Sequence, residues 1–260
     1  MTERILLTGA AGTIGTMLRP RLARAGRTLR LLDVAPLSAG DREEAVRGSV
    51  SDLDTMVAAC ADVAAVVHLG GLSTEAPWAE ILEHNINGTY TVLEAARRAG
   101  APRVVFASSN HAVGFVPMAE QVGEYRYPRP DTYYGVSKAA GEALGSLYHD
   151  RYGLDVVCLR IGSCAERPTN ERALGTWLSP DDCARLVEAS VTAPAPGFRV
   201  VWGISANTRA TWPLAEARAL GYDPQDDAEV YAGSVPPATD AEKRYLGGEF
   251  CSPDLDAPRS

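Results

Sequence analysis

Three residues near the middle of the chain could together move a proton. Tyr134 and Lys138 are four positions apart, which places both side chains on one face of a helix. A free tyrosine has a pKa of about 10 and is a weak base, but a nearby ammonium group favours the phenolate by charge. Ser109 precedes them and could hydrogen-bond the same substrate oxygen. We therefore predict Tyr134, Lys138 and Ser109 as the catalytic residues of a general-base reaction.

A glycine-rich segment near the N-terminus could hold a phosphate group. Residues 8–15 (TGAAGTIG) follow an apolar run and precede a helical pattern, with Gly9, Gly12 and Gly15 at equal spacing. Such glycines permit a tight turn and a close backbone approach to a pyrophosphate, and the helix N-terminus offers free N–H groups. The spacing GxxGxxG departs from the usual dinucleotide fingerprint, and a lone motif of this kind can be an ordinary turn.

An acid at the end of the second apolar run supports the nucleotide interpretation. Asp33 occupies that position, where a carboxylate accepts hydrogen bonds from the adenosine ribose and repels a 2′-phosphate. Val34 follows it, rather than an arginine that would bind this phosphate. We therefore predict NAD as the cofactor in preference to NADP, although Arg30 lies close by in the sequence.

Two further segments are placed where a dinucleotide could extend. Asp52 and Leu53 follow a short third strand, and Asp52 could contact the adenine or equally cap a helix. Residues 68–71 (HLGG) end the fourth strand, at the edge where ligands bind to such sheets. His68 itself is expected to be a buried core histidine.

A sheet must bring these strand ends together. Five apolar runs rich in Val, Ile and Leu lack in/out alternation, as strands buried on both faces do, and helical patterns separate them. The sequence therefore predicts an α/β fold of the Rossmann type: a doubly wound parallel sheet, helices on both faces and a small C-terminal substrate lobe. The expected strands span residues 4–8, 28–32, 64–69, 103–107 and 155–161, and the expected helices span 13–25, 53–59, 78–99 and 132–152.

The pattern is looser in the last hundred residues. A helix over 180–193 with Ser179 as its N-cap, a strand over 198–203 and a helix over 213–220 are expected there. We predict a single domain over residues 1–260. Within it, residues 1–162 would mainly bind NAD, and residues 163–260 would mainly bind substrate.

Composition excludes several classes of protein. The 260 residues are 46% hydrophobic and 22% charged, with a net charge of −8, which argues against a nucleic-acid partner. No apolar run approaches the roughly 20 residues of a membrane span, and no signal-peptide pattern is visible. The five cysteines are widely spaced and form no CxxC pair. We therefore expect reduced thiols, no metal site and a cytoplasmic location.

Taken together, the motifs resemble the extended, sugar-acting branch of the short-chain dehydrogenase/reductase superfamily, whose members are NAD-dependent epimerase/dehydratase-like enzymes. The resemblance rests on residues 8–15 (TGAAGTIG), 106–110 (FASSN) and 134–138 (YGVSK). Within that branch the chain is similar to the uronate dehydrogenases, through residues 108–111 (SSNH) and 160–163 (RIGS) among others.

This resemblance implies oxidation of the anomeric C1 hydroxyl of D-glucuronate or D-galacturonate to the aldarolactone, with hydride transfer to NAD. Tyr134 would remove the hydroxyl proton, Lys138 would hold the nicotinamide ribose and lower the tyrosine pKa, and Ser109 would orient the hydroxyl. Arg172 would clamp the substrate carboxylate in a bidentate pair; otherwise it is a solvated loop arginine. The implied substrate-binding residues are Ser73, Ser109, Asn110, His111, Tyr134, Ser163 and Arg172. The implied cofactor-binding residues are Gly9, Gly12, Thr13, Ile14, Gly15, Asp33, Asp52, Leu53, Leu69, Gly70, Gly71, Asn87, Tyr134, Lys138 and Ile161.

Two other functions are compatible with the same fold. A nucleotide-sugar epimerase or dehydratase shares the motifs, but usually carries a larger C-terminal domain than the residues after Ile161 provide. A non-catalytic NAD-sensing scaffold would not need the serine, tyrosine and lysine. The expected partner is a small uronic acid, with no nucleic acid and no membrane, and the chain could form a homo-oligomer. Glucuronate and galacturonate are not distinguished by the sequence.

Overall fold

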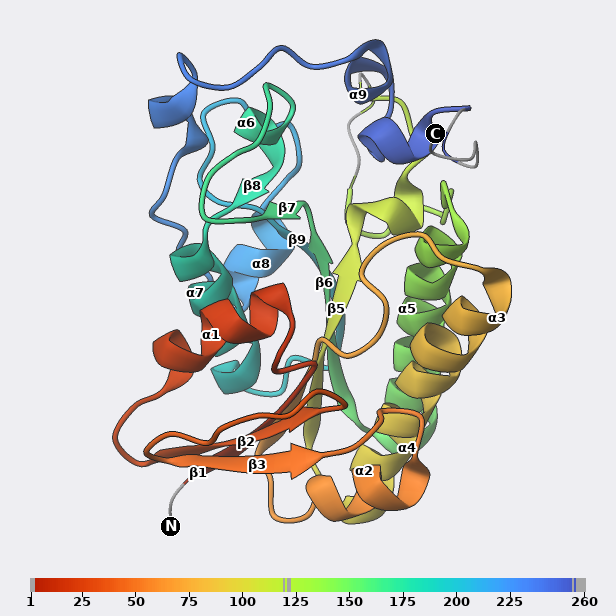
Figure 1. Ribbon diagram of the computed structural model, residues 1–260, viewed down its shortest axis with the longest axis vertical. Helices are drawn as coiled ribbons and strands as arrows, with labels where there is room; N and C mark the ends of the chain where they lie inside the picture. The colour runs from red at the N-terminus through yellow and green to blue at the C-terminus, as the bar shows by residue number, and fades with distance from the viewer. Residues whose placement is uncertain (1–2, 119, 121–122, 254, 256–260) are drawn as a thin grey trace.

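A seven-stranded sheet runs through the centre of the protein, as the computed structural model shows (Figure 1). The structure describes residues 3–118, 120, 123–253 and 255. The strand order is β3-β2-β1-β4-β5-β6-β9, and every neighbouring pair is parallel. The predicted Rossmann-type sheet is therefore confirmed. Its strands are β1 (Glu3–Thr8), β2 (Arg27–Asp33), β3 (Glu43–Arg47), β4 (Ala65–His68), β5 (Arg103–Ser109), β6 (Asp155–Ile161) and β9 (Phe198–Gly203).

The strand order reverses between β1 and β4. From β1 the chain proceeds outward to β2 and β3, and from β4 it proceeds the other way through β5 and β6 to β9. Such a reversal leaves a crevice at the carboxyl ends of the central strands, where α/β proteins bind ligands. The glycine-rich turn follows β1 and Ser109 ends β5, so the predicted chemistry collects at this edge.

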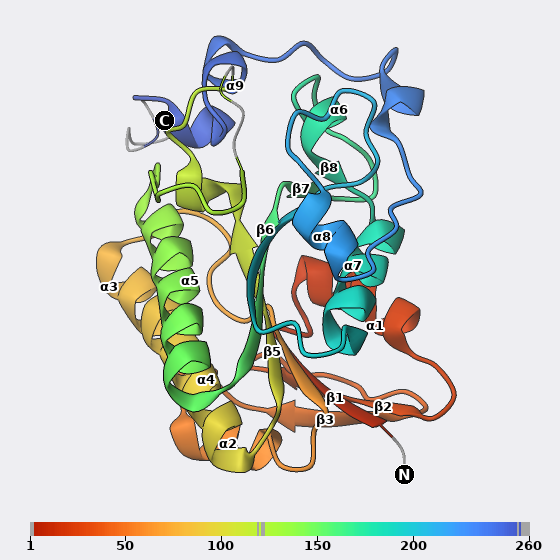
Figure 2. The same cartoon turned by 180° about the vertical axis from the view of Figure 1, so that it is seen from behind.

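Helices cover both faces of the sheet (Figures 1 and 2). On one face lie α1 (Thr13–Leu22) and α7 (Pro180–Thr192), which contact each other. On the other face lie α2 (Leu53–Ala59), α4 (Gly88–Ala99) and α5 (Tyr133–Tyr152), packed side by side. This arrangement gives the sheet two separate hydrophobic cores.

Neighbouring residues of one strand enter opposite cores. Leu7 of β1 packs on the α1 and α7 side, whereas Leu6 packs on the α2 and α4 side. Both side chains have no exposed surface, and each such burial stabilises the fold by roughly 1.5–3 kcal/mol. Because both faces are covered, the strands appear in the sequence as continuous apolar runs.

The helix that follows β4 is not regular. The expected helix over 78–99 consists of α3 (Trp78–Ile81), a π-helical turn (Leu82–Asn87) and α4, which continue one another. A π turn widens the helix locally and often occurs beside functional sites. The helix carrying Tyr134 begins where predicted: the Thr132 hydroxyl accepts the Gly135 N–H, and Gly153 ends the helix at a φ of 70°.

The later part of the chain supplies the last strand of the sheet and also forms a region beyond the carboxyl ends of the strands. β9 and α7 belong to the sheet and to one helix layer, with Ser179 capping α7 as predicted. The short pair β7 (Ser163–Cys164) and β8 (Trp177–Leu178) lies beyond the carboxyl edge (Figure 2). The remaining helices are α6 (Ala173–Thr176), α8 (Ala215–Ala219), α9 (Asp240–Arg244) and the 3-10 turns Asn110–Val113, Ala228–Tyr231 and Gly248–Cys251.

The C-terminal segment returns to the catalytic helix. After crossing the upper edge of the molecule, it lies near the start of α5 (Figure 1), where Tyr245 forms an antiparallel bridge with Pro117. None of the helices in the described part of the chain is long and apolar enough to cross a membrane. The division at residue 162 stays a prediction, because the residues after it also supply the edge strand β9.

Candidate active site

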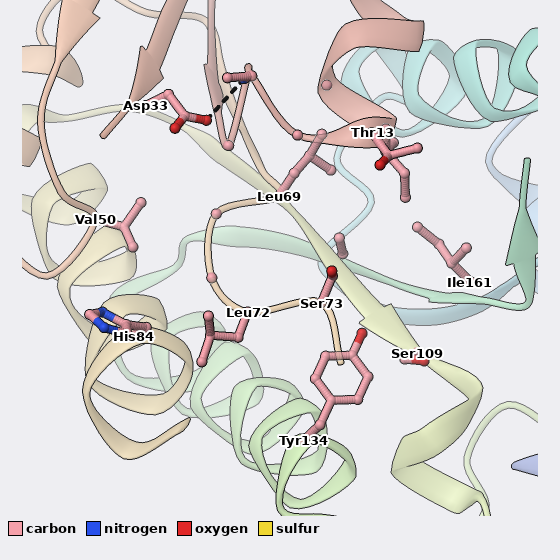
Figure 3. Close-up of a pocket in the computed structure, with 18 of the residues that line it drawn as sticks. Thr13, Asp33, Val50, Leu69, Leu72, Ser73, His84, Ser109, Tyr134 and Ile161 are labelled. Atoms are coloured by element: carbon pink, nitrogen blue, oxygen red, sulfur yellow. Dashed lines mark hydrogen bonds between the residues drawn. The ribbon is translucent and has the colours of Figure 1, made fainter. Parts of the chain in front are cut away.

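A cavity of about 630 Å³ opens at the carboxyl ends of β1, β2, β4, β5 and β6. Figure 3 shows side chains from these separate elements pointing into one space. Most of the predicted cofactor residues and all three predicted catalytic residues line it. They are Gly9, Gly12, Thr13, Ile14, Gly15, Asp33, Leu69, Gly70, Gly71, Ser109, Tyr134, Lys138 and Ile161, joined by the predicted substrate residues Ser73 and His111.

The glycine-rich turn has the shape that a pyrophosphate requires. Gly9 has a φ of 67°, and a Cβ there would lie 2.8 Å from the backbone nitrogen of Gly70. A Cβ on Gly15 would lie 2.4 Å from the Gly9 carbonyl oxygen, so the helix packs closely on the turn. No side chain caps the N-terminus of α1, which leaves its positive end available to phosphate. The turn therefore fits a dinucleotide.

Asp33 lies beside the glycine-rich turn in the same cavity. Its carboxylate accepts the N–H groups of Ala11, at 2.9 Å, and Ala35, at 3.0 Å (Figure 3). Arg30 is directed elsewhere: it donates to Glu44 at 2.9 Å and to the carbonyls that end α2. Arg30 is therefore already paired with Glu44, and Asp33 places a carboxylate at the expected ribose position.

Three predicted cofactor residues lie outside the lining. Asp52 caps α2, accepting the N–H groups of Asp54 and Thr55 at 3.1 and 3.2 Å; Leu53 and Asn87 are not among the lining residues either. Their roles in binding remain predictions. The cavity is lined instead by five residues that the sequence did not indicate: Gly48, Ser49, Val50, Leu72 and His84. The position of Gly48, directly after β3, could have indicated the first three.

Tyr134, Lys138 and Ser109 converge within the cavity. The Tyr134 hydroxyl lies near Ser109 in the cavity (Figure 3), and the Ser109 hydroxyl favours the ionised form of the phenol. The Lys138 ammonium nitrogen is 5.2 Å from the Tyr134 ring centre and donates to the Ala107 carbonyl at 2.8 Å. Tyr134 and Lys138 are each 8% exposed, so both side chains are nearly withdrawn from water.

This burial sets the protonation of the pair. It raises the pKa of Tyr134 to about 12, while the hydrogen bond with Ser109 lowers that pKa and the charge of Asp131 raises it. Burial also lowers the pKa of Lys138 to about 8. The protein residues alone therefore do not lower the tyrosine pKa as the sequence suggested. The phenolate needs further positive charge in the site.

His68 is a core residue, as expected. It is 1% exposed, and its ring nitrogens contact the hydroxyls of Thr8, at 2.9 Å, and Thr89, at 3.3 Å. Burial lowers the pKa of His68 to about 3, so the ring is neutral at ordinary pH. Thr8 also accepts the Gly70 N–H at 3.2 Å, which connects two of the cavity loops.

Three predicted substrate residues are not among the residues that line the cavity. Asn110 donates to the Leu246 carbonyl at 2.8 Å, and Arg172 donates to the same carbonyl. Ser163 shares a hydrogen bond with Thr176 at 3.3 Å. The C-terminal segment thus holds two of the three, and their roles in substrate binding remain predictions.

Phe250 is a residue that the sequence did not indicate. Its ring stacks on His111 with ring centres 4.1 Å apart, and it meets Tyr134 edge-on at 6.5 Å. It belongs to an irregular segment far from the motifs, so no periodicity or spacing could have identified it. The far end of the chain therefore packs against His111, a lining residue, and lies near the predicted catalytic tyrosine.

The fold and the site define an NAD-dependent oxidoreductase of the short-chain dehydrogenase/reductase type. The model of the NAD-dependent epimerase/dehydratase family matches residues 5–171. The chain is 42% identical to a uronate dehydrogenase of Pseudomonas putida over 95% of both chains. The crystal structure of uronate dehydrogenase from Agrobacterium tumefaciens has a TM-score of 0.91 to this chain, with 44% identity and 96% of both chains covered. A mutant of that enzyme, complexed with NAD, has the same TM-score and identity. The chain belongs to the NAD-dependent epimerase/dehydratase family and, within it, to the uronate dehydrogenases.

Proposed function

We propose that this protein oxidises the C1 hydroxyl of a hexuronate, D-glucuronate or D-galacturonate, to the corresponding aldarolactone, with hydride transfer to NAD. The observation that carries the proposal is the convergence of Ser109, Tyr134 and Lys138 on the cavity that also contains the glycine-rich turn. The similarity to uronate dehydrogenases over nearly the whole chain supports the substrate class.

The reaction removes a proton and a hydride from one carbon–oxygen unit. Tyr134 takes the proton of the C1 hydroxyl, while Ser109 donates a hydrogen bond that orients the same oxygen. Lys138 holds the cofactor ribose and adds positive charge beside the phenol. Bound NAD would supply the acceptor for the hydride of C1 and a positive charge that favours the phenolate of Tyr134. The C1–O single bond becomes the lactone carbonyl.

Arg172 is proposed to hold the substrate carboxylate. One of its guanidinium nitrogens donates to Leu246, but its Nε is buried without a hydrogen-bond partner in the described part of the chain. A buried donor without a partner is unfavourable, and a carboxylate would satisfy it with a charge-assisted bond. Ser73, Asn110, His111 and Ser163 are proposed to contact the sugar hydroxyls.

The wider assignments are also proposals. Residues 1–162 would mainly bind NAD and residues 163–260 would mainly bind substrate. The enzyme would act in the cytoplasm, without a nucleic-acid partner, and could assemble as a homo-oligomer. Size-exclusion chromatography with light scattering would measure the assembly state.

The direct test is NADH formation, followed by absorbance, with NAD and a panel of sugars. We expect turnover with D-glucuronate and D-galacturonate and at least a hundredfold lower kcat/KM with D-glucose and D-galactose, which lack the carboxylate. UDP-glucose serves as the test for a nucleotide-sugar enzyme. NAD binding without uronate oxidation would contradict the proposed substrate. Conversion of UDP-glucose would show instead that the protein is a nucleotide-sugar enzyme.

A further inference from the structure

A fully buried carboxylate lies behind the proposed substrate site. Asp131 directly precedes Thr132, the N-cap of α5, and its side chain has no exposed surface. It accepts a hydrogen bond from Nδ1 of His111 at 2.7 Å and another from the Thr132 hydroxyl at 3.0 Å. No motif or spacing pointed to this residue, which is separated from His111 by a loop.

Three chain segments leave room for this carboxylate by having glycine beside it. A Cβ on Gly114 or on Gly247 would lie 1.9 Å from Oδ2 of Asp131, and a Cβ on Gly135 would lie 2.9 Å from Oδ1. Gly114 follows the Asn110–Val113 turn, Gly135 is in the first turn of α5, and Gly247 is in the C-terminal segment. Larger side chains at these positions would displace the acid, so the packing specifies where it lies.

The carboxylate determines which nitrogen of His111 carries a proton. An ionised carboxylate can only accept hydrogen bonds, so the proton between it and His111 belongs to Nδ1. In the neutral ring Nε2 then keeps its lone pair and acts as an acceptor. Phe250 is stacked on the ring, and Tyr134 meets it edge-on at 5.7 Å, so the ring cannot turn freely.

His111 lies at the cavity and has one ring nitrogen without a protein partner in the described part of the chain. It is one of the lining residues, and its side chain is 15% exposed. Nε2 has no hydrogen-bond partner within the described residues, whereas Nδ1 is fixed on Asp131. The His111 ring therefore lines the cavity next to the Tyr134 ring, where a sugar hydroxyl could donate to Nε2.

We propose that Asp131 is a positioning residue that holds His111 in its Nδ1-protonated, neutral form, so that Nε2 accepts a hydrogen bond from a substrate hydroxyl. This inference deepens the proposed function and depends on it for the identity of the hydroxyl donor. Asp131 acts through His111 and does not touch the reacting atoms. Its charge opposes the phenolate of Tyr134, so a direct contribution to the proton transfer is not its role.

The first measurement is the protonation of the His111 ring itself. Protein labelled with ¹⁵N only in histidine contains four such residues, and the signals of His111 are those lost in His111→Asn. In the wild type we expect Nδ1 protonated and Nε2 unprotonated at neutral pH. In Asp131→Asn the amide can donate or accept, so we expect a mixture of both forms. Two protonated nitrogens in the wild type, or an unchanged pattern in Asp131→Asn, would overturn the proposal.

The second measurement is kinetic. In Asp131→Asn we expect KM for D-glucuronate to rise roughly threefold to tenfold, as for the loss of one neutral hydrogen bond, with Kd for NAD unchanged by calorimetry. His111→Asn should show a similar rise, and the double variant should show no more than either single one. Additive effects would mean that the two residues act independently and would contradict the proposal.

A matched control variant distinguishes an effect on the His111 tautomer from an effect on packing alone. The Cys251 thiol donates to Asp131 at 3.8 Å and to the Gly114 carbonyl at 3.3 Å, and within the described residues no hydrogen bond joins it to His111. Cys251→Ala should keep the wild-type histidine signals. If Cys251→Ala altered them as Asp131→Asn does, the carboxylate would have only a packing role. Because the signals are recorded without substrate, a failure to oxidise uronates would refute the proposed function and leave this result intact.

Discussion

At the scale of single residues, burial shifts the pKa values of two groups in the site toward their neutral forms. Burial keeps Tyr134 protonated, with a pKa of about 12, and lowers the pKa of Lys138 to about 8. Both shifts oppose charge, as expected in a nearly dry pocket. The phenolate form of Tyr134 therefore depends on what binds, which couples proton transfer to cofactor occupancy.

The first prediction concerns Tyr134. Tyr134→Phe removes the oxygen that takes the proton and keeps the ring that packs against His111 and Phe250. We expect kcat for D-glucuronate to fall by at least roughly a hundredfold, which is the usual contribution of general-base catalysis. Kd for NAD, measured by calorimetry, should change less than about twofold. Retained turnover would exclude Tyr134 as the base, and lost NAD binding would show a structural defect instead.

The second prediction concerns Lys138 and stability. Because its folded pKa is lowered from 10.5 to about 8, the unfolded chain binds more protons between these values. Stability therefore rises as pH increases from 8 to 10.5, and the penalty is fully present below pH 8. Lys138→Met should remove activity yet stabilise the protein at pH 7, by an amount on the order of 1–3 kcal/mol after loss of the bond to Ala107. Urea unfolding at pH 7 and pH 10 measures this difference, and a destabilised Lys138→Met protein at pH 7 would contradict it.

At the scale of elements, the loop after β4 is tied to the helix that carries Tyr134. The carboxylate of Glu75 accepts the backbone N–H groups of Tyr133, at 3.2 Å, and Tyr134, at 2.8 Å, at the first turn of α5. Ser73, in the same loop, lines the cavity. Glu75 therefore caps the helix and also fixes its position relative to the proposed substrate loop.

The third prediction compares two caps of this helix. Thr132→Ala removes the hydroxyl that accepts the Gly135 N–H, whereas Glu75→Ala removes the cap that also joins the loop. Each should lower the free energy of unfolding by about 1 kcal/mol. Glu75→Ala should in addition lower kcat/KM for D-glucuronate by roughly threefold to tenfold, and by more than Thr132→Ala, whose hydroxyl reaches the site only through its bond to Asp131. Equal kcat/KM in the two variants would show that the link to the loop has no catalytic effect.

The elements differ in how far the sequence could predict them. β1, β5 and β6 are buried on both faces, so burial appears directly as apolar runs, and their ends carried the motifs. The edge strand β3 (Glu43–Arg47) is polar and half-exposed, so hydrophobic pattern alone could not give its bounds. The π turn at Leu82–Asn87 has side-chain types compatible with an ordinary helix. Its extra backbone residue arises from tertiary packing around Asn85, whose side chain bonds Leu72 and Ser137.

At the scale of the whole molecule, the site is assembled from both ends of the chain. The Leu246 carbonyl accepts from Asn110 after β5 and from Arg172 after β6, and Phe250 covers His111. These contacts span long sequence separations and follow no local pattern, which is why the motifs identified the cofactor side better than the substrate side. We therefore expect substrate binding to depend on the docking of the C-terminal segment, whereas most of the residues that line the cavity around the glycine-rich turn come from the first half of the chain.

The last prediction tests this division through Arg172. Arg172→Ala removes the proposed partner of the substrate carboxylate and one of the two donors to the Leu246 carbonyl. Because one charged hydrogen bond or a pair of them is lost, KM for D-glucuronate should rise by roughly ten- to a thousandfold. Kd for NAD should stay unchanged, because the cradle of α1 and Asp33 is independent of this loop. Arg167→Ala is the matched control: Arg167 is exposed, lies over the Tyr231 ring at 5.8 Å and is in the same loop. A normal KM in Arg172→Ala would assign the arginine to holding the C-terminal segment, and a raised KM in both variants would mean that the loop, not the guanidinium, determines binding.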